Sequence, residues 1–453
     1  MTDVYVIGGS LPALAAALEF AEVGLQVRVA LDDAQPDSTI EPAAANEHSV
    51  DKIGARDHDG ALAAFLEHVS APLVAGDEPD PGAAPVSIAP HAVQLRNAKG
   101  GWTTQPMPAV VGIPAVPMDA QSLAILGGSG ATRAALDRIK PVLTIGKVHE
   151  IGTLVRSRLG KVALERLVDP FVRDRFGASP DEVEVAVAAP GLNEAVTRAG
   201  SLSGAALALA DRDVARETRI APREGWHHLR AALIARLRVF GAEIAPQLPL
   251  DARPTDAGWR VSEAEGAQID ARVIVADPES HVPEAVAAAC ALVAPEAWRA
   301  FASLEVEPLV GVDPESDALR VVSLPNGDIW SVRFQGSDGG RWWAHLAGPR
   351  VVRSVHPHDD GADHAIAVTT AGDALVRADA TARGPLVLEF RPAPHVTLER
   401  RDVETAARDA LREAEPSLVL VGSALFAGDL ADSIADARAV SVGVRRRLTG
   451  IAE

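Results

Sequence analysis

The sequence is short of several residue types, and each shortage excludes a class of protein. One cysteine, Cys290, stands in 453 residues, so the chain can form no internal disulfide and no cysteine-based zinc or iron-sulfur site. This usage favours a cytoplasmic protein. Basic residues number 43 against 62 acidic ones, which gives a formal net charge of −19. Because nucleic acids and anionic membranes are bound by clustered Lys and Arg, we expect neither as a partner.

Long apolar runs are also missing. The nearest approach, residues 282–298, contains Glu284, Glu296 and two prolines, and the chain begins directly with a strand pattern instead of a basic, apolar leader. We therefore expect no transmembrane segment and no secretory signal. Hydrophobic residues still make up 47% of the chain, which is enough to give two or three domains their cores.

The first thirty residues have the pattern of a strand, a glycine turn, a helix and a second strand. β-Branched residues dominate 4–7, apolar residues recur at helical spacing over 13–23, and Gly24 ends that helix before a strand at 27–31. Turns of this type place backbone N–H groups at a helix N-terminus, where they face the phosphates of a dinucleotide. The pattern predicts a Rossmann-like βαβ unit.

The turn itself departs from the usual glycine spacing. Its three positions are Gly8, Ser10 and Ala13. Alanine is tolerated at the third position, but the Ser10 side chain stands where the phosphates would come closest. The turn therefore predicts the fold more firmly than the ligand.

An acid at the end of the second strand usually accepts hydrogen bonds from the adenosine ribose. Counted from Gly8, the usual spacing falls on Leu31, and Asp32 follows one residue later. A shift of one residue turns a strand side chain to the opposite face. Asp32 can serve the ribose only if the strand ends early, and the alternative is a solvated acidic turn.

The rest of the chain alternates between α/β segments and other material. A helix at 60–69 lies between loops, a hairpin at 95–108 turns at a glycine pair, and helices extend to about 209. An α/β pattern restarts at 225–278, alternating stretches within 309–398 predict antiparallel strands, and the last segment, 417–448, reads as a strand, a glycine-containing loop and a helix. This order is typical of a nucleotide-binding domain with two large insertions.

Three local groups are candidates for binding. His and Asp residues cluster at 356–364, but Pro357 and Gly361 favour a solvated loop, and we expect no metal site. Adjacent strand residues face opposite ways, so only one of Trp342 and Trp343 can line a cavity, where it could stack on a planar ligand; core packing is the alternative. Arg173 and Arg175, beside Asp174, could bind a carboxylate or form ion pairs instead.

Four stretches resemble the protoporphyrinogen and coproporphyrinogen oxidases, FAD-dependent flavoproteins of the amine-oxidase and glutathione-reductase-like superfamily. Together they span most of the chain in the same order. They are VVGIPAVPMDAQSLA (110–124), IGKVHEIGTLVRSRLGKVALERLVDPFVRDRFGASPDEVEV (145–185), PREGWHHLRAALIARLRVFGAEI (222–244) followed by ARVIVADP (271–278), and LVLVGSALFAGDLADSIADARAV (418–440).

The resemblance implies an α/β fold with a discontinuous Rossmann-like FAD/NAD(P)-binding domain, an inserted mixed-sheet substrate domain and a helical subdomain. The FAD-binding domain comprises 1–75, 215–290 and 390–453, the β-rich substrate domain 76–125 and 291–389, and the helical subdomain 126–214. The implied activity is hydride transfer from a tetrapyrrole-like or amine-like small molecule to FAD, with reoxidation by oxygen or another acceptor. The cofactor carries this chemistry, so no catalytic side chain is assigned; the oligomeric state is open, with a homodimer as one alternative.

The resemblance also assigns binding positions. The positions expected to contact FAD are Gly8, Gly9, Ser10, Ala13, Asp32, Leu250, Asp277, Gly422 and Ser423. The positions that we expect beside the substrate are Arg173, Asp174 and Trp343.

Departures from the family pattern concern the cofactor site. The glycine-pair loop after the second strand reads QPDSTIEP here, an acid is replaced by Ser423, and a glycine pair is replaced by Arg173 and Asp174. Each change can cost a hydrogen bond, about 0.5–1.5 kcal/mol. The alternative function is therefore a flavin-free homologue, a pseudoenzyme or a binding or regulatory protein that keeps the fold.

Overall fold

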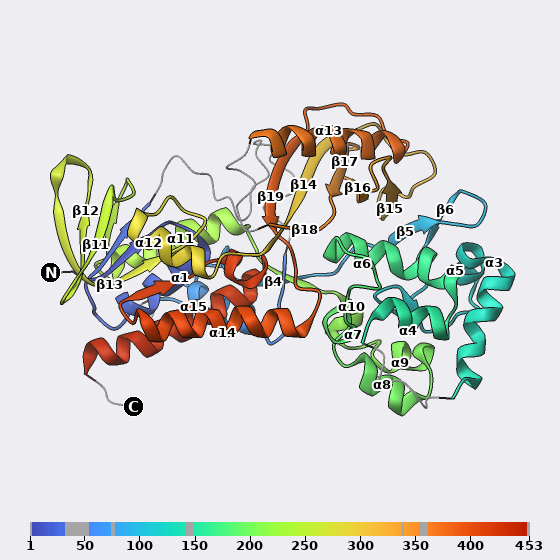
Figure 1. The fold of residues 1–453 in the computed structure, drawn as a ribbon, viewed down its shortest axis with the longest axis horizontal. Helices are drawn as coiled ribbons and strands as arrows, with labels where there is room; N and C mark the ends of the chain where they lie inside the picture. Colours follow the sequence, from blue (N-terminus) through green and yellow to red (C-terminus); the bar gives the residue numbers. More distant parts are fainter. Residues whose placement is uncertain are drawn as a thin grey trace. The chain divides into compact units, whose positions relative to one another are not determined.

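The computed structural model describes residues 2–31, 54–73, 78–141, 149–337, 339–353 and 361–450 (Figure 1). Asp32 and His356 to Asp360 lie outside these ranges. The chain divides into two compact units. Unit 1 comprises Met1–Ile88, Thr218–Pro295 and Val403–Glu453, and unit 2 comprises Ala89–Glu217 and Glu296–Asp402. The finer division into three domains stays a prediction.

Unit 1 is built on a seven-stranded sheet in which β10, β2, β1, β13 and β20 run parallel. β12 and β11 extend it antiparallel beside the first half of β13. The strands are β1 (Thr2–Ile7), β2 (Val27–Ala30), β10 (Glu243–Ala245), β11 (Asp251–Thr255), β12 (Gly258–Ser262), β13 (Gln268–Ala276) and β20 (Leu418–Leu420). A smaller sheet contains β3 (Ala55–Arg56), β9 (Arg219–Pro222) and β4 (Pro85–Ile88).

Helix α1 (Leu11–Ala21) is buried along its whole length. Its many alanines allow close contact with α11 (Trp226–Val239) and α15 (Leu430–Thr449). Glu19 is buried in α1 and accepts from Arg438 at 2.8 Å and from Arg445 at 2.7 Å, so α15 neutralises it. The other helices of unit 1 are α2 (Ala61–Ser70), η4 (Ala264–Gly266), α12 (Glu284–Leu292), η6 (Ser423–Phe426) and most of α14 (Leu398–Ala414).

Unit 2 has an eight-stranded sheet in the order β18-β14-β17-β16-β15-β5-β6, with β19 also paired to β14. α13 (Gly361–Arg377) lies over one face, as Figure 1 shows, and contacts β14, β15, β16, β17 and β19. The strands are β5 (Val93–Arg96), β6 (Trp102–Thr104), β14 (Ala297–Val306), β15 (Asp317–Ser323), β16 (Ile329–Gly336), β17 (Trp342–Ala347), β18 (Val351–Val352) and β19 (Val387–Pro392).

The helical part of unit 2 surrounds a second core that includes β7 (Ala109–Val110) and β8 (Ile113–Pro114). Its α6 also contacts β15 and β16 of the large sheet. The helices are α3 (Ala120–Ala135), η1 (Leu136–Ile139), α4 (Ile151–Arg158), α5 (Lys161–Ala163), the π-helical η3 (Leu164–Val168), α6 (Asp169–Phe176), α7 (Val185–Ala188), α8 (Leu192–Ala199), α9 (Leu202–Ala208) and α10 (Asp213–Arg216).

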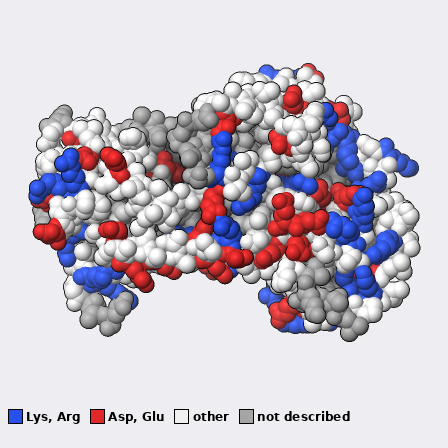
Figure 2. Space-filling model, viewed as in Figure 1, with Lys and Arg blue, Asp and Glu red and all other residues white. Residues whose placement is uncertain are grey.

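Charges of both signs are mixed over the face drawn in Figure 2. Exposed ion pairs, such as Arg260 with Asp270 and Arg156 with Asp181, also place opposite charges next to each other. Among the helices of the described ranges, none is both long and apolar enough to cross a membrane. The same ranges contain no group of three or more His, Cys, Asp or Glu side chains placed to hold a metal ion.

Candidate functional site

The turn between β1 and α1 is built on Gly8. Its φ of +105° lies in the region that favours glycine, and its N–H donates to the carbonyl of Ala30 in β2 at 3.0 Å. A Cβ at this position would lie 2.3 Å from Oγ of Ser280. Gly8 therefore allows the tight turn and leaves room for a side chain of the same unit.

The guanidinium of Arg230 lies against Gly9, the next residue of the turn. Nε of Arg230, on α11, donates to the Gly9 carbonyl at 3.2 Å, and a Cβ at position 9 would lie 2.7 Å from Nη2 of the same side chain. The positive end of the α1 dipole and the guanidinium charge thus meet at one place. Both favour a negatively charged group there.

Ser10 is the N-cap of α1. Its Oγ accepts a long, 3.4 Å hydrogen bond from the N–H of Ala13, and the residue is 9% exposed. The hydroxyl therefore satisfies a donor of the first helical turn that a bound phosphate could otherwise engage. Leu31, just after β2, is buried at 4% exposure, so the expected position for a ribose-binding acid holds an aliphatic side chain.

Asp277 follows β13 and lies beside two glycine turns at this edge of the sheet. One is the Gly8 turn after β1, and the other is the Gly422 turn after β20. Its side chain is 1% exposed, and its Oδ1 accepts from the N–H of Glu279 at 2.9 Å. Gly422, which follows β20, has φ +130°, and a Cβ there would lie 2.6 Å from Asp277 Oδ1. A Cβ at Gly8 would lie 3.6 Å from the Asp277 Cβ. The carboxylate thus stands between the two turns.

A second acidic residue, Glu279, contacts the Gly422–Ser423 turn. The hydroxyl of Ser423 donates to Oε2 of Glu279 at 3.2 Å. Burial, and next the charge of Asp277, raise the pKa of Cys290 to about 12. Cys290 is therefore a protonated, inert thiol at neutral pH and not a candidate nucleophile.

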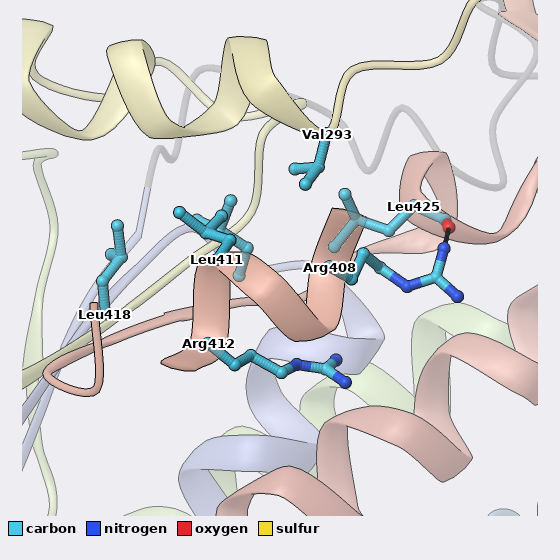
Figure 3. A pocket seen from close by; sticks show the side chains of 7 residues that line it. Val293, Arg408, Leu411, Arg412, Leu418 and Leu425 are labelled. Atoms are coloured by element: carbon cyan, nitrogen blue, oxygen red, sulfur yellow. Dashed lines mark hydrogen bonds between the residues drawn. The ribbon is translucent and has the colours of Figure 1, made fainter. Parts of the chain in front are cut away.

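Arg408 of α14 contacts the residues that directly follow the Gly422–Ser423 turn. Its Nη1 donates to the Leu425 carbonyl at 2.6 Å (Figure 3), and its guanidinium lies 4.3 Å from the ring centre of Phe426. The same side chain lines a small space of about 230 Å³, open mouth included, together with Val293, Leu411, Arg412, Leu418, Leu420 and Leu425. Because sites for drug-sized ligands occupy about 300–1,000 Å³, this space is too small for a dinucleotide.

The structure brings most of the expected cofactor positions to one edge of the parallel sheet. Strands β1, β13 and β20 end there together, as their parallel register requires. Leu250 lies elsewhere: it is 73% exposed, and its N–H donates to the Ser262 carbonyl of β12 at 2.8 Å. The positions that meet at the edge are Gly8, Gly9, Ser10, Ala13, Asp277, Gly422 and Ser423.

The large sheet of unit 2 has one apolar and one polar face. Side chains under α13 are apolar, among them Trp330 and Trp342. Alternate positions of the same strands point to the opposite face. We call this opposite side the polar face; it carries Asp317, Ser331, Arg333, Gln335, Trp343, His345, Arg299, Phe301, Ser303, Glu305, Glu389 and Arg391.

Arg333 is the centre of a charge network on the polar face. It donates to Asp174 of α6 at 2.5 Å and to Asp317 at 2.8 Å. Gln335 donates to Asp317 at 3.2 Å, and the His91 ring lies 3.1 Å from the same carboxylate. Burial raises the pKa of Asp174, but the charge and hydrogen bond of Arg333 outweigh it, so the net pKa lies below its usual value.

Arg299 ties the C-terminal end of α6 to the sheet. Its guanidinium donates to the carbonyls of Arg173, Asp174 and Arg175 at 3.1 Å each, and it is 1% exposed. Burial lowers the pKa of Arg299 to about 10. The Arg173 side chain pairs with Asp169 at 2.8 Å, one helical turn earlier. Asp174 of α6 contacts the polar face through Arg333, and Trp343 is part of that face by its position in β17. The Arg173 guanidinium is instead engaged along its own helix.

Sequence reasoning missed Arg230, Arg333 and His345. The signal for the two sheet residues was present, since Arg333 and Gln335, and likewise Trp343 and His345, repeat at a spacing of two. Charged residues at alternate positions of a predicted strand indicate a polar face. Nothing local marks Arg230, because its partner Gly9 is 221 residues away.

Comparison with known proteins gives a structural likeness and no sequence relative. No family model and no curated protein matches the chain. A candidate protoporphyrinogen oxidase from Exiguobacterium sp. 255-15 has a TM-score of 0.65 at 16% identity, with 98% of this chain and 99% of that chain covered. Reduced UDP-galactopyranose mutase gives 0.58 at 11% identity, with 100% and 96% covered.

Cyclohexylamine oxidase from Brevibacterium oxydans IH-35A gives a TM-score of 0.51 at 14% identity, with 99% of each chain covered. Identities this low show the fold alone. The chain therefore has the mixed α/β fold of FAD-dependent oxidoreductases with a Rossmann-like domain. The fold class predicted from the sequence is confirmed.

Proposed function

We propose that the protein is an FAD-dependent oxidoreductase resembling the protoporphyrinogen and coproporphyrinogen oxidases, in which a tetrapyrrole-like or amine-like substrate gives hydride to the flavin. The observation that carries the proposal is the Arg230 guanidinium over Gly9 at the N-terminus of α1. Parallel α/β sheets bind dinucleotides at this edge. The guanidinium supplies positive charge where Ser10 replaces a glycine, so the residues present fit a pyrophosphate.

The chain's own residues would bind and orient both partners. Arg230 and the backbone of Gly9 and Ser10 would hold the pyrophosphate. The Ser423 hydroxyl lies at the same edge but would have to leave Glu279 to donate to the cofactor. When bound, FAD would supply the hydride acceptor. The polar face of unit 2, with Asp174 and Trp343, is the proposed substrate surface.

A flavin-free binding protein is the second candidate, and the position of Asp277 favours it. This buried carboxylate and that of Glu279 bring negative charge to the two turns that a pyrophosphate would approach. Ser280 already fills the room beside Gly8. Like charges placed together without intervening water repel strongly.

The absorption spectrum of the purified full-length protein separates the two candidates. A visible flavin band, released on denaturation, supports the oxidoreductase. Arg230→Met should then weaken FAD binding about 10- to 100-fold, the worth of a hydrogen bond to a charged group. Arg238→Met, an exposed position on the same helix, is the matched control. A colourless protein with no thermal shift on FAD addition overturns the proposal and supports the flavin-free homologue.

A further inference from the structure

We infer that His91, which Asp317 holds beside the polar face of unit 2, takes the proton that the substrate loses when it gives hydride to FAD. The inference rests on the proposed function and adds a catalytic residue to it. Three observations support it. A fixed carboxylate holds one nitrogen of the imidazole, the other nitrogen has no partner among the described residues, and most other acid–base groups of the face are engaged.

The carboxylate that holds His91 is fixed in place. Asp317 of β15 is 5% exposed, and it accepts from Arg333 at 2.8 Å and from Gln335 at 3.2 Å, both on β16. Its backbone N–H donates to the carbonyl of Ala92, the residue after His91, at 2.9 Å. The imidazole therefore meets a carboxylate whose position is set by the sheet and by the backbone next to His91.

The proton of the neutral His91 ring lies on the nitrogen that faces Asp317. Nδ1 of His91 is 3.1 Å from Oδ1 of Asp317. The carboxylate oxygens already accept from Arg333 and Gln335, and an ionised carboxylate only accepts, so Nδ1 is the donor. The lone pair is then on Nε2. This is the tautomer of a general base that an aspartate orients.

The second ring nitrogen is left for a substrate. The His91 side chain is 55% exposed, and its Nε2 makes no hydrogen bond within the part of the chain that the structure describes. An imidazole takes and returns protons near neutral pH, as general base catalysis requires. A proton taken by Nε2 can pass on to water.

The His91–Asp317 pair adjoins the proposed substrate surface. Asp317 belongs to the polar face, and Gln335, which donates to it, lies directly opposite Trp343 in the pairing of β16 with β17. Since neighbouring strands are about 4.8 Å apart, Asp317 and Trp343 are about 10 Å apart across the face. A substrate on this face therefore lies next to His91.

The acids at the centre of the polar face are already engaged. Asp174 and Asp317 both accept from Arg333, at 2.5 and 2.8 Å. Glu389 is in contact with Arg391. A carboxylate that takes a proton here would lose its ion pair and leave an arginine in a half-buried site without its partner.

Two other residues of the polar face could compete with His91 as the base. His345 is unsuitable, because burial lowers its pKa to about 4 and its Nε2 is shut off from solvent. Glu305, opposite Trp343 on β14, is the remaining rival. The test below includes a variant of Glu305 for this reason.

The proton transfer balances the hydride transfer. The substrate's C–H bond breaks, and its hydrogen leaves with both electrons to FAD. An N–H bond attached to or conjugated with that carbon breaks as well. Its electron pair enters the new C=N double bond, and its proton forms a bond to Nε2 of His91. The carboxylate of Asp317 stabilises the imidazolium that results, and water then takes the proton from the exposed ring.

Acylation by diethyl pyrocarbonate tests the arrangement in the full-length protein and needs neither FAD nor a substrate. The reagent forms a bond to an unprotonated imidazole nitrogen, and peptide mass spectrometry locates it. We expect His91 to react about three- to tenfold faster than His364, which is exposed on α13, because one hydrogen bond orients its lone pair. Asp317→Asn should remove the difference. Equal rates for the two histidines in the wild type overturn the inference, even if Asp317→Asn does not fold.

Anaerobic reduction of the flavin tests the step itself, with coproporphyrinogen III and benzylamine as hydride donors. His91→Ala should slow reduction by about 10²- to 10⁴-fold and leave the FAD content and the melting temperature unchanged. Free imidazole should restore part of the rate in His91→Ala and have no effect on the wild type, which a merely structural role does not explain. His364→Ala is the matched control and should change nothing.

The outcomes separate this inference from the proposed function. In a protein whose flavin is reduced, equal rates in the wild type and His91→Ala overturn the inference alone. Slow reduction in Glu305→Gln but not in His91→Ala does the same, since Glu305 is then the base. A colourless protein, or one whose flavin neither donor reduces, overturns the proposed function and the step that rests on it.

Discussion

The guanidinium of Arg333 in β16 donates a 2.5 Å hydrogen bond to the carboxylate of Asp174, which lies 159 residues earlier in α6. This pair joins the helical part of unit 2 to its large sheet. Asp317 accepts from the same guanidinium at 2.8 Å. Arg333 therefore neutralises two carboxylates, one on α6 and one on β15. Without a paired cation, burying either carboxylate would be unfavourable.

Arg333→Met should destabilise the protein by about 3–5 kcal/mol, because it leaves Asp174 and Asp317 without their shared cation. Asp174→Asn in the same background should recover part of the loss. Urea unfolding of the wild type, of Arg333→Met and of the double variant measures the loss of stability and its recovery. Arg260→Met, which breaks the exposed pair with Asp270, is the control and should leave stability unchanged. A stable Arg333→Met protein would show that the network is dispensable.

Stability should fall on acidification because of His345. Burial lowers its pKa from 6.5 to about 4 in the folded protein, so between these values the unfolded chain binds more protons. The contribution of this histidine is complete above pH 6.5 and is lost as the pH falls toward 4. His345→Gln should flatten the slope of melting temperature against pH in this window. A slope parallel to that of the wild type would refute the assignment.

Gly422→Ala should destabilise unit 1 by about 1–3 kcal/mol, since φ is +130° and the new Cβ would lie 2.6 Å from Asp277 Oδ1. Asp277→Ala in addition should recover only the steric part of the loss. Gly443→Ala, with no atom within 4 Å of its Cβ position in α15, should stabilise by about 0.5–1 kcal/mol. Denaturant unfolding compares these variants, and a harmless Gly422→Ala would mean that the turn is not constrained.

Arg408→Met should loosen the turn after β20, because it removes the 2.6 Å bond to the Leu425 carbonyl and the contact with Phe426. The backbone amides of Leu425 and Gly428, which donate to Gly422 and Ser423, should exchange faster with deuterium. Arg412→Met on the same helix removes a different ion pair, to Asp436, and should leave these amides protected. Equal exchange in wild type and Arg408→Met would count against a positioning role.

Local sequence patterns were sufficient for the first βαβ unit. The strand, helix and strand predicted at 4–7, 13–23 and 27–31 are β1, α1 and β2. The hairpin at 95–108 is also present, as β5 and β6, with Arg96 opposite Trp102. In these segments the residues that decide the structure are neighbours in the chain.

Alternating stretches in 309–398 predicted antiparallel strands, which are present as β15, β16 and β19, but the helix α13 between them was not predicted. Its buried positions are Ala367, Ala371, Ala374 and Leu375, and a stripe composed mostly of alanine gives a weak hydrophobic period. The charge networks escaped prediction for a different reason. The partners of Arg230 and Arg333 are selected by the packing of elements far apart in sequence, and the Arg173–Asp174 pair that remained open from sequence does not form.

The three-segment construction of unit 1 sets the order in which the protein can mature. Glu19 of α1 receives its arginines from α15, 419 and 426 residues later, and β20 joins the sheet from the same late segment. All of unit 2 leaves the ribosome before that segment does. Domains fold as units, so the opening βαβ unit must wait for α15 to cover one side of its apolar helix until translation is almost finished, even though α11, which packs on α1 as well, is made earlier. A stalled or truncated chain that lacks α15 would therefore leave the apolar surface of α1 that α15 normally covers exposed to solvent, where chaperones can bind it.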